Sequence, residues 1–363
     1  MLYYLFTPLR EWWFGFNVFR YITFRAVMAS VTAFLLTLFL APLVVRWLKS
    51  FRVEQRVREK SEVGGLYDLH HHKDGTPTMG GLLIVAALLG STLLWSDFLQ
   101  PAVLLVSGVT VSLCLLGFLD DWSKIRQKSS KGLPARTRLF WQSVIGLVFV
   151  LLLLRDPKTS TALEVPFWKG SLVNLGFWII PFSALVLVGT CNAVNLADGL
   201  DGLAIGCTAM IALCLTVLAY LTGHRAVSEY LLISHVQAAA ELTIFCAALA
   251  GASIGFLWYN AQPASVFMGD TGSLALGGAI GAVAVIIKKE LLLVLLGGIF
   301  VVEALSVILQ VASFRLTGRR IFRMAPLHHH FQLAGWQESK VTVRFWIIGA
   351  ILALLSLSTL KLR

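Results

Sequence analysis

Five polar clusters in this chain contain the residue types that bind metal ions and phosphates and that transfer protons. They interrupt a sequence that is otherwise strongly apolar. The clusters are His70-His71-His72-Lys73 with Gly75-Thr76-Pro77-Thr78-Met79-Gly80-Gly81, then Asp120-Asp121, then the run from Asn192 to Asp201, then Asn260 with Phe267-Met268-Gly269-Asp270, and finally His328-His329-His330. Carboxylates, amides and imidazoles together predict chemistry on a charged, oxygen-rich ligand.

Three aspartates in these clusters are candidate metal ligands. Asp120 and Asp121 end an apolar segment, where adjacent carboxylates are costly unless they meet water, cations or a metal. Adjacent helical residues point about 100° apart, so both can address one centre only where the helix is ending, as the polar run after Lys124 indicates. Together with Asp270 they offer oxygen ligands that suit Mg²⁺ shared with substrate phosphates. The alternatives are a solvated stop signal for the pair and a helix cap for Asp270.

The run from Asn192 to Asp201 predicts a polar binding surface. Asn192, Asn195 and Asp198 are spaced by three residues, which places them along a broad stripe of a helix or its C-terminal extension. Glycines on either side of position 200 then loosen the backbone. The alternative is an amide-rich helix end that satisfies its own carbonyl groups, which explains the asparagines better than the aspartates.

Two basic groups are candidate phosphate contacts. His328, His329 and His330 lie among arginines, a composition suited to phosphate contact or proton transfer, although a solvated surface run has the same composition. Lys73 precedes a glycine-rich loop whose amides can approach a phosphate, so it can act as a point charge there. His70 to His72 are less specific, because the acids beside them are typical of an ordinary polar loop.

Glu303 is an acid inside an apolar segment. Such a residue marks either a functional site or a buried hydrogen bond to a neighbouring helix, and the sequence favours neither. The chain contains no Walker-type or dinucleotide-binding glycine motif, so any nucleotide must be bound by another architecture.

The composition indicates that the chain carrying these clusters is surrounded by a lipid bilayer. Of the 363 residues, 57% are hydrophobic and 13% are charged, and the mean hydropathy is +0.79, which excludes an ordinary soluble domain. The net charge is +11, but the lysines and arginines that produce it flank apolar segments and do not form a basic surface on a soluble domain. We therefore expect no nucleic-acid partner. The cysteines lack the spacing of a zinc site or disulfide framework and are expected to pack within the membrane. No cleavable signal peptide is evident, because the first 20 residues carry aromatic and charged side chains.

Ten apolar segments predict an all-α, polytopic integral membrane protein with about ten transmembrane helices. Crossing about 30 Å of hydrocarbon takes roughly 20 apolar residues, and no alternating pattern indicates a β-barrel. The predicted spans are 22–48, 78–98, 101–119, 136–154, 173–191, 202–222, 239–257, 271–287, 290–312 and 341–360.

The basic residues predict how these spans are oriented. The loops after spans one, three and nine hold 19 of the 30 lysines and arginines, which predicts that those loops are cytoplasmic and that both termini are on the non-cytoplasmic side. The five polar clusters follow odd-numbered spans, so they share one membrane face and predict one composite site. A transporter is the rival interpretation, but it would spread polar residues through the membrane midplane.

Several of these runs resemble the polyprenyl-phosphate hexosamine-1-phosphate transferases. The aspartate pair and the Asn/Asp run are shared by the wider superfamily, and the histidine triplet after Ala-Pro-Leu points to the branch that uses a muramoyl-pentapeptide donor. The resemblance covers nearly the whole chain and implies a single membrane-embedded transferase domain, 1–363. The matching runs are 75–81, 117–121, 192–202, 266–270, 325–331 and 343–348.

The resemblance implies a reaction and its partners. Phospho-N-acetylmuramoyl-pentapeptide would pass from its UDP carrier, UDP-N-acetylmuramoyl-pentapeptide, to undecaprenyl phosphate, giving lipid I and UMP in peptidoglycan synthesis, with Mg²⁺ required. The site would lie at the cytoplasmic face of the bacterial inner membrane, surrounded by membrane lipid, and the protein would be a homodimer. Another UDP-N-acetylhexosamine donor is the alternative within this class. Direct attack by the lipid phosphate and a phosphoryl-enzyme use the same residue types, so both routes stay open.

The site residues receive roles on the same basis. We expect Asp270 to ligate Mg²⁺ on the diphosphate, Asp120 or Asp121 to assist the lipid phosphate, and His329 to take part in catalysis. Lys73, His328 and His330 would hold phosphate or sugar oxygens, and Asn192 would bind a polar part of the substrate. The resemblance implies a uridine pocket lined by Asn195, Asp198, Asp201, Asn260 and Phe267. Two departures are the His-His-His-Lys-Asp run at 70–74 and Gln332, where an acid is expected.

Overall fold

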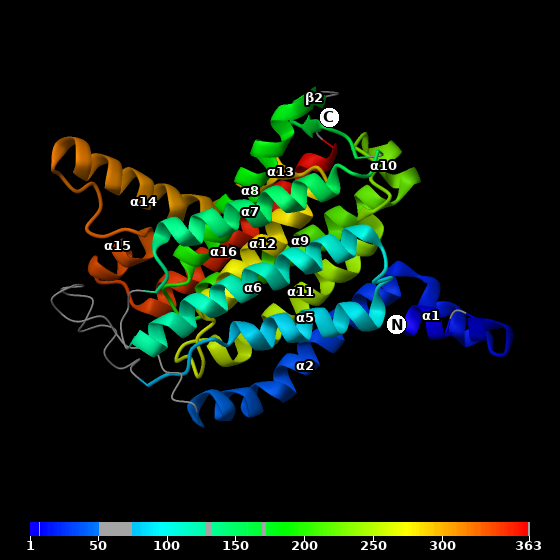
Figure 1. Cartoon of the computed structure of the whole chain (residues 1–363), viewed down its shortest axis with the longest axis horizontal. Coiled ribbons are helices and arrows are strands. Elements are labelled where there is room, and N and C mark those ends of the chain that lie inside the picture. The colour runs from blue at the N-terminus through cyan, green and yellow to red at the C-terminus, as the bar shows by residue number, and fades with distance from the viewer. Residues whose placement is uncertain (7, 51–74, 128–131, 158, 169–171, 362–363) are drawn as a thin grey trace.

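The computed structural model describes all residues except 7, 51–74, 128–131, 158, 169–171 and 362–363 (Figure 1). Helices make up most of the described chain, and short 3₁₀ turns connect some of them. The helices are α1 (Leu2–Phe6), α2 (Ile22–Ser50), α5 (Gly81–Trp95), α6 (Pro101–Gln127), α7 (Ala135–Leu153), α8 (Ile179–Ala197), α9 (Leu203–Gly223), α10 (Arg225–Leu231), α11 (Ala239–Asn260), α12 (Gly269–Ile286), α13 (Glu290–Leu296), α14 (Gly298–Thr317), α15 (Leu327–Leu333) and α16 (Glu338–Ser358).

Nine helices within the described residues are long and apolar enough to cross a membrane. This confirms a polytopic helical membrane protein, with nine candidate spans where the hydropathy pattern predicts ten. The second predicted span, 78–98, is helical only over the 15 residues of α5. A helix of that length extends about 22 Å, less than the thickness of the hydrocarbon core.

Two other predicted spans have wrong boundaries. The ninth, 290–312, is divided at Gly297 into α13 and α14, because the chain leaves helical geometry there. The fifth, 173–191, begins in a strand, and its helix starts only at Ile179. Hydropathy alone did not detect either change, since the residues on both sides of each break are apolar.

A two-stranded hairpin is the exception to the predicted all-α fold. Strands β1 (Ala162–Glu164) and β2 (Leu172–Asn174) pair antiparallel between α7 and α8. A buried ion pair holds this hairpin to the bundle, with Lys289 Nζ 2.6 Å from Glu164 Oε2. The strands were missed because three-residue strands carry too short a pattern to stand out from apolar flanks.

Helix α12 lies in the middle of the bundle and packs against α6, α8 and α5 (Figure 1). Every residue of α12 from Thr271 to Ile286 is buried, and many of them are glycine or alanine. Small residues let helix backbones approach closely where lipid supplies no hydrophobic driving force. The five cysteines are buried and free, which confirms their prediction as packing residues.

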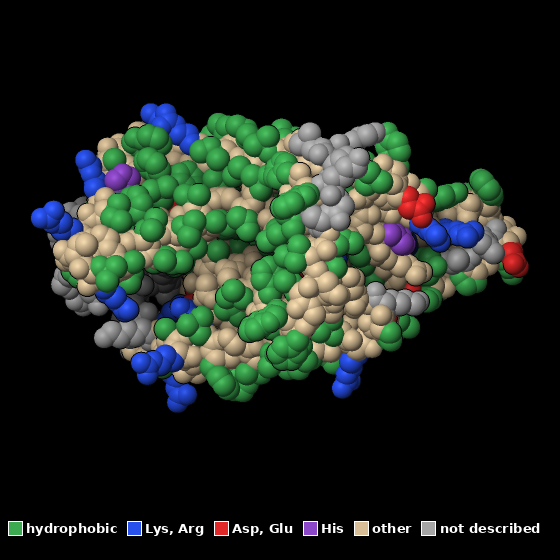
Figure 2. All heavy atoms as spheres, turned by 90° about the horizontal axis from the view of Figure 1, so that it is seen from above, with side chains coloured by type: hydrophobic (Ala, Val, Ile, Leu, Met, Phe, Trp, Pro, Cys, Tyr) green, Lys and Arg blue, Asp and Glu red, His purple; other side chains and the backbone are tan. Residues whose placement is uncertain are grey.

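The two ends of the bundle differ in composition. Figure 1 shows both chain termini towards the right-hand ends of the helices, whereas α15 and the far end of α14 lie at the left. On the face seen in Figure 2, most lysine and arginine side chains gather around the left-hand end, and hydrophobic side chains cover the length of the bundle. The C-terminal end of α6, which carries Asp120 and Asp121, also lies at the left in Figure 1.

Candidate active site

Two glycines allow the site to assemble, because they let α5 and α6 touch the first turn of α12. A Cβ on Gly117 of α6 would lie 2.2 Å from the backbone oxygen of Asp270, and a Cβ on Gly81 would lie 2.1 Å from the amide nitrogen of Gly272. Both distances are shorter than any side chain tolerates. The glycines therefore fix how near Asp270 comes to the carboxylates of α6.

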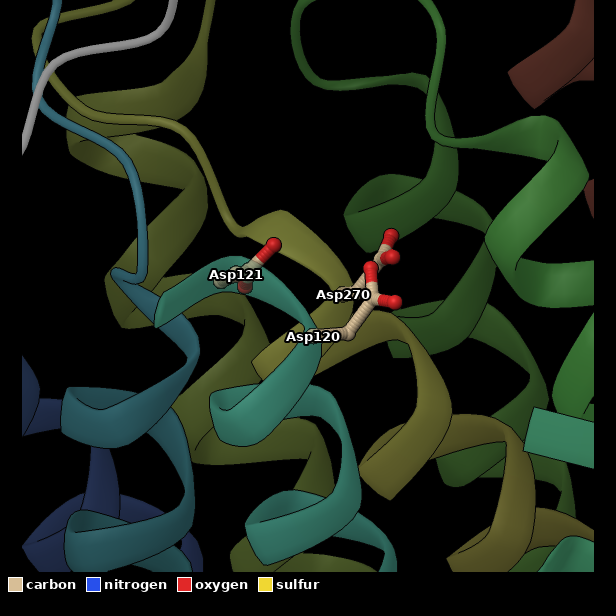
Figure 3. A group of neighbouring side chains, drawn as sticks. All are labelled: Asp120, Asp121 and Asp270. Atoms are coloured by element: carbon tan, nitrogen blue, oxygen red, sulfur yellow. The ribbon is translucent and has the colours of Figure 1, made fainter. Parts of the chain in front are cut away.

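Asp120, Asp121 and Asp270 form a carboxylate cluster (Figure 3). One oxygen from each lies within 4.8 Å of the others, and the residues Asp120 and Asp121 are only 1% and 4% exposed. Helix α6 continues for six residues beyond the pair and ends at Gln127, within the polar run after Lys124 where the sequence indicated its end. Both carboxylates still meet Asp270 because the first turn of α12 packs directly against this part of α6.

Asp121 is the residue that binds the start of α12. Its Oδ2 accepts hydrogen bonds from the Thr271 amide at 2.9 Å and from the Thr271 hydroxyl at 2.8 Å. The N-cap residue of α12 is Met268, and Asp270 lies in the first turn, so Asp270 is near the positive end of the helix without being its cap residue. Its Oδ1 instead accepts a hydrogen bond from Asn195 Nδ2 at 2.6 Å.

Two cations, Lys124 and Arg138, complete the cluster, and neither was predicted as a site residue. Lys124 Nζ lies 2.6 Å from Asp120 Oδ2, 2.7 Å from Asp270 Oδ2 and 3.4 Å from Asp121 Oδ1. Arg138 of α7 places Nη1 3.2 Å from Asp270 Oδ2. The spacing of four residues from Asp120 to Lys124 on one helix could have indicated the first contact. No sequence signal indicates the contact between Arg138 and Asp270.

The carboxylate cluster fits a divalent cation. Mg²⁺ takes oxygen ligands, usually from one or two carboxylates with water and substrate phosphate completing the shell. Three carboxylates from α6 and α12 converge within ligand-sharing distance, and Lys124 and Arg138 show that the position already attracts positive charge. Asp120, Asp121 and Asp270 are therefore the residues that could hold a metal.

Some residues of the Asn/Asp run contact the carboxylate cluster, and others hold neighbouring helices together. Asn195 contacts Asp270 and the Ser273 hydroxyl. Asn192 instead donates to Gln142 Oε1 at 2.7 Å, which ties α8 to α7. Asp198 is half-buried at the C-terminal end of α8.

Asp201 and Asn260 hold loops together. The Asp201 carboxylate accepts a hydrogen bond from the Ala264 amide at 3.0 Å. Asn260 accepts one from the Gly202 amide at 3.1 Å and donates one to the Val266 carbonyl at 2.8 Å. These contacts join the turn between α8 and α9 to the loop between α11 and α12, which carries Phe267.

The glycine-rich loop pairs with the segment that leads into Asp270. Phe267 donates its amide to the Pro77 carbonyl at 2.8 Å and accepts from the Gly80 amide at 2.9 Å. The Gly81 amide donates to the Met268 carbonyl, also at 2.9 Å. Phe267 itself is half-buried. His70 to His72 and Lys73 lie outside the described residues.

The three adjacent histidines of α15 lie in different environments. His328 and Glu303 are both 0% exposed, with His328 Nδ1 3.2 Å from Glu303 Oε2. A Cβ on Gly199 would lie 2.3 Å from His328 Nε2, so this imidazole packs on the Asn/Asp run. His329 and His330 are half-buried, and His329 Nδ1 lies 2.9 Å from Oε1 of Gln332, the residue that stands where an acid was expected.

Glu303 also binds the backbone of the histidine helix. Its carboxylate accepts hydrogen bonds from the amides of Leu327 at 2.8 Å and His328 at 3.2 Å. Of the two alternatives for this acid, the buried hydrogen bond to a neighbouring helix is the one present. Glu303 therefore supports the site by holding the backbone of the histidine helix.

The described parts of all five clusters thus form one connected assembly. Backbone pairs join the glycine-rich loop to the Phe267 segment, Asp121 joins α6 to α12, Asn195 joins α8 to Asp270, and His328 joins α15 to the Asn/Asp run.

Comparisons with known proteins agree with this assembly. A family model, Glycosyl transferase family 4, matches residues 103–288, and a phospho-N-acetylmuramoyl-pentapeptide-transferase signature matches residues 73–85. The chain is 50% identical to phospho-N-acetylmuramoyl-pentapeptide-transferases of Oleidesulfovibrio alaskensis, Thermodesulfovibrio yellowstonii and Pelobacter propionicus, with 100% of both chains covered in each comparison. Because this likeness covers complete chains and the residues matched by the family model include all three clustered aspartates, the chain belongs to the phospho-N-acetylmuramoyl-pentapeptide-transferase family, within glycosyl transferase family 4.

Proposed function

We propose that this chain transfers phospho-N-acetylmuramoyl-pentapeptide from its UDP carrier to undecaprenyl phosphate, giving lipid I and UMP, with Mg²⁺ held by Asp120, Asp121 and Asp270. The observation that carries the proposal is the convergence of these three carboxylates in a chain that matches this family over its full length. The polar groups gather at helix ends on one side of the bundle, which favours a transferase over a transporter.

The chemistry requires anions to be brought together. Both the UDP diphosphate and the lipid phosphate are negatively charged, so positioning and charge neutralisation account for most of the catalysis. Mg²⁺, when bound, supplies positive charge to the diphosphate oxygens. Arg138 and Lys124 already lie within ion-pair distance of Asp270 and can contact phosphate oxygens near it.

The other residues of the connected polar clusters supply the remaining proposed substrate contacts. We propose that Asn195, which contacts Asp270, lines the uridine pocket together with Asp198 and Phe267, and that the half-buried ring of Phe267 stacks on uracil. Asp201 and Asn260 shape that pocket by holding its loops. We propose that the half-buried His329 and His330 contact phosphate or sugar oxygens, that Lys73 does the same, and that Asn192 binds a polar part of the substrate.

The basic end of the bundle supports the proposed orientation. Arg138 contacts Asp270 of the carboxylate cluster, Arg323 contacts the histidine helix α15, and an excess of lysine and arginine marks the cytoplasmic side. We therefore propose that the active site faces the cytoplasm of a bacterial inner membrane and that both termini face outward. The homodimer stays a prediction from the resemblance.

One assay tests the reaction, the donor, the metal and the orientation. Sealed membrane vesicles containing the protein are prepared in both orientations and given undecaprenyl phosphate with the impermeant donor UDP-N-acetylmuramoyl-pentapeptide. We expect UMP release from inside-out vesicles alone, its loss on chelation with EDTA and its return with Mg²⁺. UMP release from intact right-side-out vesicles would contradict the proposed cytoplasmic active site. UMP release in the presence of EDTA would contradict the proposed requirement for Mg²⁺. Equal UMP release with a different UDP-N-acetylhexosamine would contradict the proposed specificity for the muramoyl-pentapeptide donor.

Replacing Glu303 by Gln tests whether this acid positions the histidine helix. The amide keeps the size of the side chain but loses one of the two acceptor oxygens that bind the amides of Leu327 and His328. The lost buried hydrogen bond loosens the histidine helix, and because a misplacement of about 1 Å can cost about 100-fold in rate, we expect kcat to fall about 10- to 100-fold. Glu229→Gln removes an exposed acid and is the control. Normal turnover by Glu303→Gln would exclude this role.

A further inference from the structure

Lys124 occupies the centre of the carboxylate cluster. Its ammonium contacts all three aspartates, at 2.6 Å from Asp120, 2.7 Å from Asp270 and 3.4 Å from Asp121. The Lys124 side chain is 29% exposed, whereas the side chains of Asp120 and Asp121 are 1% and 4% exposed. The cation is therefore the accessible member of the group, and its four-carbon stem gives it freedom to move.

A divalent cation and this ammonium cannot share the cluster at low cost. Mg²⁺ binds carboxylate oxygens at about 2.0–2.1 Å, so a metal on the oxygens of Asp120 and Asp270 would lie within a few ångströms of Lys124 Nζ. Like charges that close repel strongly in a partly buried site, where the effective dielectric constant is far below that of water. One of the two cations must leave the shared oxygens.

We propose that Lys124 is an exchangeable counter-ion of the metal site. It neutralises Asp120 and Asp270 before metal binding, and in the metal-bound state its ammonium moves off the carboxylates towards the entering phosphate. The inference rests on the proposed metal role of the three aspartates and goes beyond it, because it assigns Lys124 a position in each of two states.

The neighbouring charges support an exchange and not a fixed ion pair. Three carboxylates face Lys124 and Arg138, so the cluster keeps a net negative charge with both cations present. Asn195 and Thr271 also donate hydrogen bonds to Asp270 and Asp121, which holds those carboxylates in place when the ammonium departs. The released ammonium would remain beside the diphosphate, where a mobile lysine is a suitable phosphate contact.

Metal binding to purified variants tests the competition directly. Mn²⁺ serves as the probe, and free Mn²⁺ is measured by electron paramagnetic resonance without substrate. We expect Lys124→Met to bind Mn²⁺ about tenfold more tightly than the parent protein, because the competing charge is gone. Arg126→Met is the matched control, since it removes a cation two residues away that is exposed. Unchanged or weaker binding by Lys124→Met would overturn the proposal.

A second measurement uses the unaltered protein, so it holds even where Lys124→Met fails to fold. An amine-acetylating reagent is applied with EDTA or with Mn²⁺, and modification of each lysine is followed by mass spectrometry. We expect Lys124 to react severalfold faster with Mn²⁺, while the exposed Lys340 reacts equally in both conditions. An equal rate at Lys124 would show that the ammonium stays in place and would overturn the exchange.

The two measurements distinguish failure of this inference from failure of the metal site itself. If the parent protein binds no Mn²⁺, or if Asp270→Asn binds it as tightly as the parent, the three aspartates do not hold the metal and the inference falls with them. If the parent binds Mn²⁺ through Asp270 and either of the expected Lys124 results fails to appear, the metal site stands and the exchange is wrong.

Discussion

Asp270→Asn is expected to lower kcat by about a thousandfold or more, because the substitution removes a charged oxygen ligand at the point where α6, α8 and α12 meet. The amide has almost the same shape as the carboxylate, so the helical packing around Asp270 is retained. It cannot, however, provide the negative charge that attracts Mg²⁺, and one of its two terminal atoms becomes a donor facing Asn195, Lys124 and Arg138. Initial rates of UMP release with saturating Mg²⁺ measure the effect.

Asp97→Asn is the control for that variant, since it removes an acid beyond the opposite end of α5. We expect this control to keep normal turnover at its usual metal requirement. Thermal unfolding of both variants in detergent should stay close to that of the parent protein. Near-normal turnover by a folded Asp270→Asn protein would exclude Asp270 as a ligand needed for transfer.

Gly117→Ala is expected to destabilise the protein by about 3 kcal/mol and to lower transfer at least about a hundredfold, because overpacking forces backbone shifts. The added methyl would lie 2.2 Å from the Asp270 carbonyl oxygen and 2.7 Å from the Thr271 Cα, so the start of α12 must move away from α6. That movement separates Asp270 from Asp120 and Asp121. Unfolding temperature and UMP release are measured on the same preparations.

Gly108→Ala is the matched control because it adds the same methyl to the same helix where no atom lies within 4 Å. Alanine is the better helix former, so we expect this control to be as stable as the parent or slightly more stable. Equal behaviour of the two variants would show that the close approach of α6 to Asp270 is not needed for the site.

The sequence predicted the side chains of the site better than the elements that hold them. Asp120, Asp121 and Asp270 could be found because acids are costly beside apolar segments and so stand out there. The break at Gly297 and the hairpin at 162–174 could not be found, because both occur within apolar surroundings where hydropathy changes little. Packing between helices decides those boundaries.

Contacts between helices that are distant in the sequence also could not be predicted from a single sequence. Arg138 reaches Asp270 only because α7 packs beside α6, and nothing in its own neighbourhood distinguishes it from the other basic residues of that loop. The three histidines looked equivalent in sequence. In the structure His328 is enclosed by Glu303 and Gly199, whereas His329 and His330 remain partly accessible, because one helical face is buried and the others are not.

The assignment of the metal to the three aspartates is tested most directly by phosphorus electron-nuclear double resonance on Mn²⁺ bound to the protein together with UDP-N-acetylmuramoyl-pentapeptide. If Asp120, Asp121 and Asp270 hold the metal on the donor's diphosphate, the spectrum should show a strong coupling between Mn²⁺ and phosphorus that disappears in Asp270→Asn at the same Mn²⁺ concentration. The same coupling in both proteins would place the metal elsewhere and contradict the account.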